Sequence, residues 1–140
     1  MSAIRTAIYN KFITKVEGSY VDFYDDIGGR LYYEKAPSDV TEPYAVFSFI
    51  SGKKMYWFAE TTPDVGNDEL VQFMIYDKKD NGLSAIEGYV VNMHSLYDFC
   101  DLTITGYTLM EMRNISYKQP ILIDDMRQAM TTYRIKMDKD

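Results

Sequence analysis

The only histidine of this chain, His94, is the first residue to consider for metal or acid–base chemistry. Asp98 lies four residues further on, so on a helix the two side chains share one face and could hold a metal ion together. A third ligand would have to come from a distant part of the chain, because no cluster of Cys and His residues accompanies them. We therefore expect His94 to lie on a helix surface, and we expect no metal and no cofactor.

The only cysteine, Cys100, could serve as a nucleophile if His94 lay beside it. Six residues of helix turn two side chains about 240° apart, so the pair would meet only if the helix ended between them. Cys100 follows Phe99, and we expect it to pack as a small buried apolar group. A single cysteine also excludes an intramolecular disulfide and indicates a reducing compartment.

Acidic and glycine-rich segments match no motif for ligands. Asp22, Asp25 and Asp26 lack the spacing and the central glycine of a calcium loop, and we expect residues 20–29 to form a solvated loop that ends in a Gly-Gly turn. Neither a phosphate-binding glycine pattern nor a GxSxG elbow occurs. We expect no enzyme, although a carboxylate-only active site stays open as an alternative.

Two amphipathic helices are predicted from apolar residues that recur every three or four positions. The first ends at Gly18, and the second covers residues 83–97. Ser84 with Glu87 has the spacing of a capping box for the second helix, and Asp80 is the alternative cap. The residues predicted to be buried are Ile4, Ala7, Ile8, Phe12 and Val16 in the first helix, and Leu83, Ile86, Val90, Met93 and Tyr97 in the second.

Strands are predicted at residues 30–34, 44–51, 69–76 and 102–113, and a last strand follows Asp125. Residues 114–124 are assigned to no element. Segment 44–51 is apolar on both faces, as in a strand that lies centrally in a sheet or has its second face covered by a partner. Inward-facing residues predicted in the other strands are Val71, Phe73, Ile75, Leu102, Ile104, Met110, Met112, Ala129, Tyr133, Ile135 and Met137.

This order of elements over 140 residues predicts a single domain, residues 1–140, of the α+β class. We expect an antiparallel or mixed β-sheet with the two helices packed on one face. The net charge is −6 and no run of basic residues occurs, which argues against sequence-specific binding to nucleic acid. No signal peptide and no membrane-spanning segment are recognisable, so we expect a protein made and kept in the cytoplasm.

Aromatic residues make up 15% of the chain, and 13 of them are tyrosines. In the long connection 53–67, Met55, Tyr56, Trp57 and Phe58 form a run that cannot all face one core, because alternation turns half of them outward. Either a bend tucks them over the helices, or they form a subunit contact, in which Trp and Tyr are common anchors.

Several short patterns occur in an order that resembles the tail-terminator, or tail-completion, proteins of long-tailed bacteriophages. RLYYEKAP precedes Pro43-Tyr44-Ala45-Val46-Phe47; Glu69-Leu70-Val71-Gln72-Phe73 follows the aromatic loop; and Leu102–Tyr107 follows the second helix. The match covers most of the chain and rests on order and spacing rather than on one motif. Gly88 inside the second helix and residues 121–126 depart from it.

The resemblance implies a structural virion protein that forms a hexameric ring. This ring caps the tail tube, ends tail growth and joins the tail to the head. Its partners would be further copies of itself, the tail tube protein and a head-completion or neck protein. It would act at the tail–head junction of the virion, after assembly in the host cytoplasm. The alternatives are another neck or head–tail connector protein, or a cytoplasmic α+β domain that binds a small ligand.

Two sets of residues follow as candidates for such a role. Tyr44 and the run Met55–Phe58 are candidates for the contact with other subunits or with the tail. The acidic residues are expected to concentrate toward the lumen of a ring, where they would repel passing DNA. The lumen candidates are Asp22, Asp25, Asp26, Asp124 and Asp125.

Overall fold

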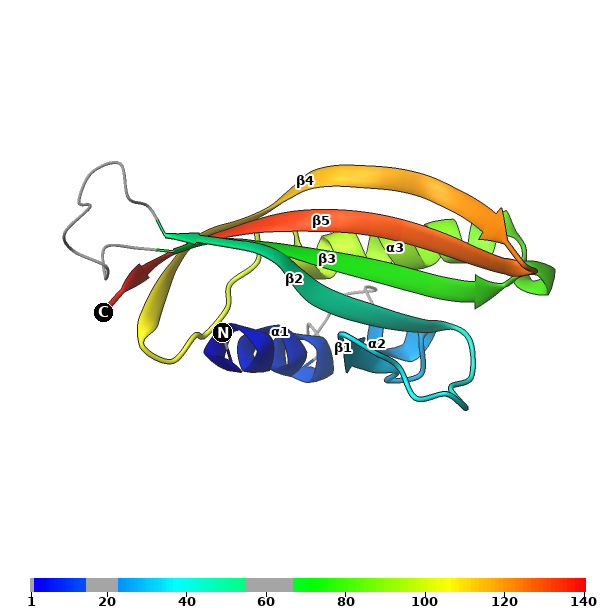
Figure 1. Cartoon of the computed structure of the whole chain (residues 1–140), viewed down its shortest axis with the longest axis horizontal. Coiled ribbons are helices and arrows are strands. Elements are labelled where there is room, and N and C mark those ends of the chain that lie inside the picture. The colour runs from blue at the N-terminus through cyan, green and yellow to red at the C-terminus, as the bar shows by residue number, and fades with distance from the viewer. Residues whose placement is uncertain (1, 15–22, 55–66) are drawn as a thin grey trace.

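Five strands form one mixed sheet in the order β1-β2-β3-β5-β4, and the helices lie against it (Figure 1). This computed structural model describes residues 2–14, 23–54 and 67–140. The predicted α+β class is confirmed. The elements are α1 (Ser2–Thr14), α2 (Phe23–Asp26), β1 (Leu31–Tyr33), β2 (Tyr44–Lys54), β3 (Asn67–Lys78), the 3-10 helix η1 (Lys79–Asn81), α3 (Leu83–Tyr97), β4 (Tyr107–Ile123) and β5 (Met126–Lys139).

The sheet combines one parallel and three antiparallel contacts. β1 runs parallel to β2, with Leu31 opposite Ala45. β2 pairs with β3, β3 with β5, and β5 with β4, all antiparallel. Helix α3 connects β3 to β4 across one face of the sheet. The last strand, β5, lies between β3 and β4, both of which precede it in the chain. β1 and β4 are consequently the two edges of the sheet.

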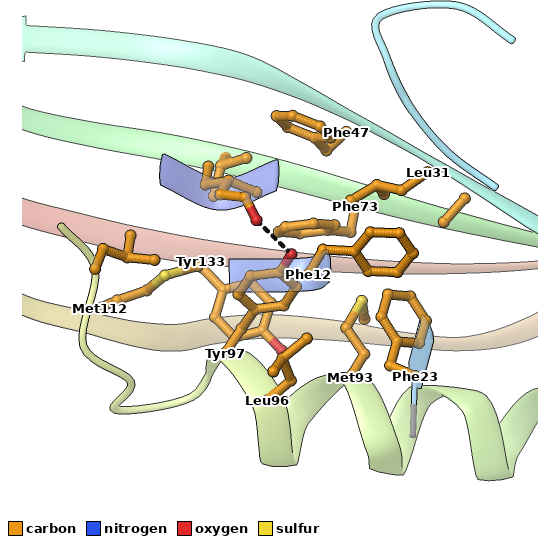
Figure 2. Close-up of a cluster of buried hydrophobic side chains, with 14 of the residues drawn as sticks. Phe12, Phe23, Leu31, Phe47, Phe73, Met93, Leu96, Tyr97, Met112 and Tyr133 are labelled. Carbon is orange, nitrogen blue, oxygen red and sulfur yellow. Dashed lines mark hydrogen bonds between the residues drawn. The ribbon is translucent and has the colours of Figure 1, made fainter. Parts of the chain in front are cut away.

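The core lies between one face of the sheet and the helices (Figure 2). Alternate residues of β3 and β5 point into it, with Val71 opposite Tyr133. The rings of Phe73 in β3 and Tyr97 in α3 have centroids 4.9 Å apart. The Tyr97 hydroxyl donates a hydrogen bond of 2.9 Å to the carbonyl oxygen of Ile8 in α1. Helices α1 and α3 therefore share one side of the sheet, as predicted.

Residues 23–26 form the short helix α2, where the sequence predicted a loop. The reason is burial: Phe23 lies in the core with its ring centroid 5.7 Å from that of Phe12. Asp26 Oδ2 accepts a hydrogen bond of 2.6 Å from the Asn92 amide, which links α2 to α3. Phe23 thus adds a turn of helix to the core in a segment whose aspartates favoured a loop.

Helix α3 spans the predicted residues 83–97, and Ile86, Val90, Met93 and Tyr97 are buried as expected. The prediction was wrong for Leu83, which is exposed because it is the first residue of the helix and precedes the part that covers the core. Gly82 stands at the N-cap with φ 85°, and no side chain caps this end. Neither the capping box nor Asp80 therefore performs the predicted role.

The strand predicted at residues 102–113 begins later, at Tyr107, after a turn at Gly106 with φ 85°. Met110 is exposed rather than inward-facing, because a register shift between Leu109 and Glu111 makes it the extra residue of a bulge. Met112, beyond the bulge, is buried as predicted. The alternation of inward-facing and outward-facing side chains along β4 is thus interrupted by one residue.

Residues 114–123, which the sequence left unassigned, continue β4 to a total of 17 residues. Pro120 is compatible with this strand because β4 is an edge strand and Pro120 lies in the register shift between Lys118 and Ile121, where it has no paired residue on β5. Asp124 and Asp125 form the turn into β5 with φ values of 50° and 63°. Positive φ at both central residues is the geometry of a type I′ hairpin turn.

Candidate interaction surface

His94 is half-buried at the junction of α3, β4 and β5, and it is not the simple surface residue that the sequence predicted. Its Nδ1 atom lies 2.8 Å from the hydroxyl oxygen of Tyr133, and its ring centroid lies 5.9 Å from that of Tyr117. Burial lowers the pKa of His94, and the nearby Asp98 opposes this shift. Asp98 Oδ1 accepts a hydrogen bond of 2.8 Å from the backbone N–H of Asn114. The side chain of His94 therefore links α3 to β5, and that of Asp98 links the end of α3 to β4.

Cys100 packs against the core, as expected, with its Sγ atom 3.6 Å from Sδ of Met112. Burial raises the pKa of its thiol to about 11, so the thiol stays protonated near neutral pH and is a poor nucleophile. Among the residues that the structure describes, no group of three or more His, Cys, Asp or Glu side chains could hold a metal ion. Within the same residues, no helix is long and apolar enough to cross a membrane.

Tyr44 belongs to a cluster of half-buried tyrosines on the sheet face opposite the helices. It stacks on Tyr76, its partner across β2 and β3, with ring centroids 4.9 Å apart. Tyr32 of β1 lies edge-on to Tyr44 at 6.4 Å. We call Tyr32, Tyr44 and Tyr76 the tyrosine patch. Burial raises the pKa of Tyr44 and Tyr76, so both hydroxyls remain neutral hydrogen-bonding groups.

A groove of about 460 Å³ adjoins the tyrosine patch. Its apolar side consists of Tyr44, Val46, Tyr76 and Met126, and its other wall is the connection from β1 to β2, residues 34–42. This geometry agrees with the apolar second face that the sequence predicted for residues 44–51. The other predicted contact residues, Met55, Tyr56, Trp57 and Phe58, lie outside the described residues.

Strand β4 carries a second apolar surface, which sequence reasoning missed. Its six large apolar side chains with high exposure, between 40% and 58%, are Met110, Ile115, Tyr117, Ile121, Leu122 and Ile123. We call them the edge strip. The signal in the sequence was the apolar composition of residues 115–123, which Pro120 obscured. Apolar side chains gathered on one exposed element mark an interaction surface.

The acidic residues predicted to line a lumen are not one cluster of equivalent groups. Asp25 is exposed, whereas Asp26 is half-buried and bonded to Asn92. Asp124 and Asp125 are exposed at the tip of the β4–β5 hairpin, and Asp125 Oδ1 lies 4.0 Å from Lys79 Nζ. Asp22 lies outside the described residues.

The fold is similar to solved structures over nearly the whole chain. One is a chain from the virion of a native gene transfer agent particle, with a TM-score of 0.67 and 13% sequence identity, covering 98% of this chain and 98% of that chain. A second solved chain, described without a function, has a TM-score of 0.68 and 11% identity over 99% of this chain and 96% of its own. No protein-family model and no curated protein matches the sequence. At these identities the likeness establishes the fold.

Proposed function

We propose that this chain is a structural protein of a phage-type virion that forms a ring at the end of the tail tube. The ring ends tail growth and joins the tail to the head. The observation that carries the proposal is the likeness in fold to a chain from a gene transfer agent virion, over 98% of both chains. The resemblance of the sequence to tail-terminator proteins supports the more specific role at the tail–head junction.

The surfaces of the described residues support a role in assembly. The tyrosine patch and the edge strip offer apolar contact area on two different parts of the sheet. Tyr and similar side chains give contact area at a low cost in conformational entropy and retain a polar tip. His94 and Cys100, the residues considered for chemistry, instead contact Tyr133 and Met112. These contacts support a non-enzymatic role.

The mechanism would be competitive capping. The ring adds to the last ring of the tail tube through a matched face, and it presents a different face that tube subunits do not bind. That second face would receive the head-completion or neck protein. Assembly would take place in the host cytoplasm, and the protein would then remain in the virion.

The excess of acidic residues would serve, in this proposal, to keep DNA from binding to the wall of the ring. A ring at this position surrounds the path of DNA, and a wall that bound phosphates would slow its passage. Asp25, Asp124 and Asp125 are exposed and could contribute to a repelling lumen. Asp26 is the weaker candidate because its carboxylate holds Asn92.

Two other roles are supported by some of the same observations. Another neck or head–tail connector protein would account equally for a virion likeness in fold. A small-ligand-binding domain would use the open groove of about 690 Å³ between α1 and residues 101–105, which includes Thr6, Asn10 and Thr103. Its wide opening to solvent favours a surface contact over an enclosed ligand site.

The proposal is tested by mixing the purified protein with isolated tail tubes lacking a cap. We expect rings at one end of each tube in negative-stain images, and tubes that no longer elongate when tube protein is added. Light scattering after size-exclusion chromatography gives the subunit number. A protein that remains monomeric at high concentration and leaves tube ends open would contradict the proposed function.

A further inference from the structure

Asn81 is the only asparagine of the chain that a glycine follows, since the others precede Lys, Asp, Met or Ile. Glycine has no side chain to shield its backbone nitrogen, and its backbone is the least restricted of all residues. The nitrogen of Gly82 can therefore reach the side-chain carbonyl carbon of Asn81 more readily than its counterpart can at the other asparagines. Asn81 is exposed at the end of η1, and Gly82, with φ 85°, is the N-cap of α3.

The side-chain amide of Asn81 is held by a buried carboxylate. Its Nδ2 atom donates a hydrogen bond of 2.7 Å to Oδ1 of Asp77, which also accepts one of 2.9 Å from the backbone N–H of Lys78. The backbone N–H of Gly82 donates a hydrogen bond of 3.1 Å to the carbonyl oxygen of Lys79. Both nitrogens that an attack of Gly82 on Asn81 would involve are thus restrained in the folded protein.

Asp77 is a poor neighbour for a second negative charge. It is completely buried, and its Oδ2 atom has no hydrogen-bond partner in the described part of the chain. Arg127 lies opposite it in the register of β3 and β5, but the Nε atom of Arg127 is likewise buried and unpartnered there. The charged side chains that η1 and the adjoining strand end and turn contribute are exposed: Lys78, Lys79, Asp80, Asp124 and Asp125. A carboxylate at position 81 would therefore face one that burial already disfavours.

We propose that Asn81 is a site of spontaneous deamidation, and that Asp77 protects it as long as this corner of the molecule stays folded. When the corner opens, the Gly82 nitrogen attacks Cγ of Asn81 and the Cγ–Nδ2 bond breaks. Ammonia leaves and takes the proton of the Gly82 nitrogen with it. Addition of a water molecule then opens the cyclic imide to aspartate or isoaspartate. The inference is independent of the proposed function.

Deamidation should loosen a corner at which several elements meet. An aspartate at position 81 has no proton to donate at neutral pH, so the bond to Asp77 is replaced by repulsion between two carboxylates. In the same 3-10 helix, the backbone N–H of Lys79 donates a hydrogen bond of 3.0 Å to the carbonyl oxygen of Asp125 in the β4–β5 turn (Figure 1). The effect is therefore expected at the start of α3 and at this turn.

The first test measures deamidation at each asparagine by peptide mapping with mass spectrometry, after incubation at mildly alkaline pH. In urea, Asn81 should react fastest of all, and in native buffer it should react far more slowly. Asp77→Ala should raise the native rate about tenfold, the change that corresponds to the loss of one hydrogen bond to a charged group. Asp77→Asn keeps an oxygen acceptor without the charge, so it should give an intermediate rate and provides the comparison if the alanine variant does not fold.

The matched control for this test is Val71→Ala, which truncates another completely buried residue of β3 far from η1 along the strand. It should leave the rate at Asn81 close to the wild-type rate. Urea denaturation of each variant gives the stability against which the rates are compared.

The second test uses Asn81→Asp, which reproduces one product of the reaction. This variant should lower the midpoint of thermal unfolding at neutral pH. Adding Asp77→Asn exchanges the amide and the carboxylate, and it should restore most of the loss because the amide at position 77 can then donate to the carboxylate at position 81. The control is Ser84→Asp, which adds the same charge at an exposed position in the first turn of α3 and should not lower the midpoint.

Each contrary outcome overturns a stated part of the inference. If Asn81 reacts no faster in urea than the other asparagines, it is not a preferred site. If Val71→Ala accelerates the reaction as much as the Asp77 variants at equal stability, global folding rather than Asp77 protects the amide. An Asn81→Asp variant as stable as the wild type, as would result if Arg127 paired with the new carboxylate, would refute the expected loosening of the corner.

Discussion

His94 and Tyr133 connect α3 to β5, with 2.8 Å between Nδ1 and the hydroxyl oxygen. The wild-type pKa of His94 is lowered by burial from the ordinary value of 6.5. The unfolded chain therefore binds this proton more readily than the folded chain. The stability that depends on a neutral His94 is present above pH 6.5, and it is lost as the pH falls toward the lowered pKa.

We predict that His94→Gln makes the free energy of unfolding less sensitive to pH across this window. Glutamine keeps a polar group near Tyr133 and does not titrate. Urea denaturation of both proteins above and below pH 6.5 measures the effect. Parallel losses of stability in the two proteins would contradict it, and assembly at neutral pH should be unaffected.

Glu69 is a second buried titratable group, with only 5% of its surface exposed and its Oε2 atom without a hydrogen-bond partner in the described structure. Burial raises its pKa above the ordinary value of 4.5. Folding therefore favours the protonated acid, so its contribution is complete below pH 4.5 and is lost as the pH rises through the raised pKa.

Glu69→Gln should consequently raise the free energy of unfolding at neutral pH, with no gain below pH 4.5. The matched control is Glu87→Gln at an exposed position of α3, which should change little. Thermal unfolding at several pH values measures both. A loss of stability at neutral pH in Glu69→Gln would show that the carboxylate makes a favourable contact.

At the scale of elements, α3 shows how one helix divides its residues between core and solvent. Val90 is 4% exposed and Val91 is 62% exposed, although they are neighbours in the sequence. The 100° turn between successive residues of a helix accounts for the difference. The same substitution at these two positions therefore measures the effect of burial, because helix propensity and the introduced charge are equal at both.

We predict that Val90→Asp destabilises the protein by about 3–5 kcal/mol, because it buries an unpaired charge. Val91→Asp should stay within about 0.5 kcal/mol of the wild type, as exposed substitutions usually do. Chemical denaturation at a protein concentration that keeps subunits apart measures both. Equal effects of the two substitutions would place the wrong face of α3 in the core.

At the scale of the whole molecule, the β4–β5 turn tests the acidic-lumen proposal without disturbing the fold. Asp124 and Asp125 have positive φ, which lysine disfavours, so a charge reversal would also strain the backbone. Asn and Gly adopt this conformation readily. Asp124→Asn with Asp125→Gly therefore removes two charges and preserves the hairpin.

This double variant should form rings normally, and virions that carry it should eject DNA less efficiently. The control is Asp101→Asn with Glu87→Gln, an equal loss of charge at exposed positions away from this turn. Measurement of DNA release and infectivity compares them. Normal ejection by the turn variant would leave the net charge of −6 as a determinant of solubility alone.

Local patterns in the sequence were sufficient to predict the class of fold and most of the core. Periodicity identified α3 and placed Ile86, Val90 and Met93 on its buried face, and alternation identified Val71, Phe73 and Ile75 in β3. These patterns are local, since a helix or strand that is half-covered must repeat its apolar residues at the spacing of its own geometry.

The positions at which that local periodicity stops depend on tertiary contacts. The bulge at Met110 depends on pairing with β5, and Pro120 is tolerated because it lies in a register shift of an edge strand. Phe23 forms a helical turn because Phe12, in the preceding helix α1, offers it a buried contact. The edge strip became recognisable as a surface for the same reason: exposure is set by which strands lie next to each other, and that is a property of long-range pairing rather than of neighbouring residues.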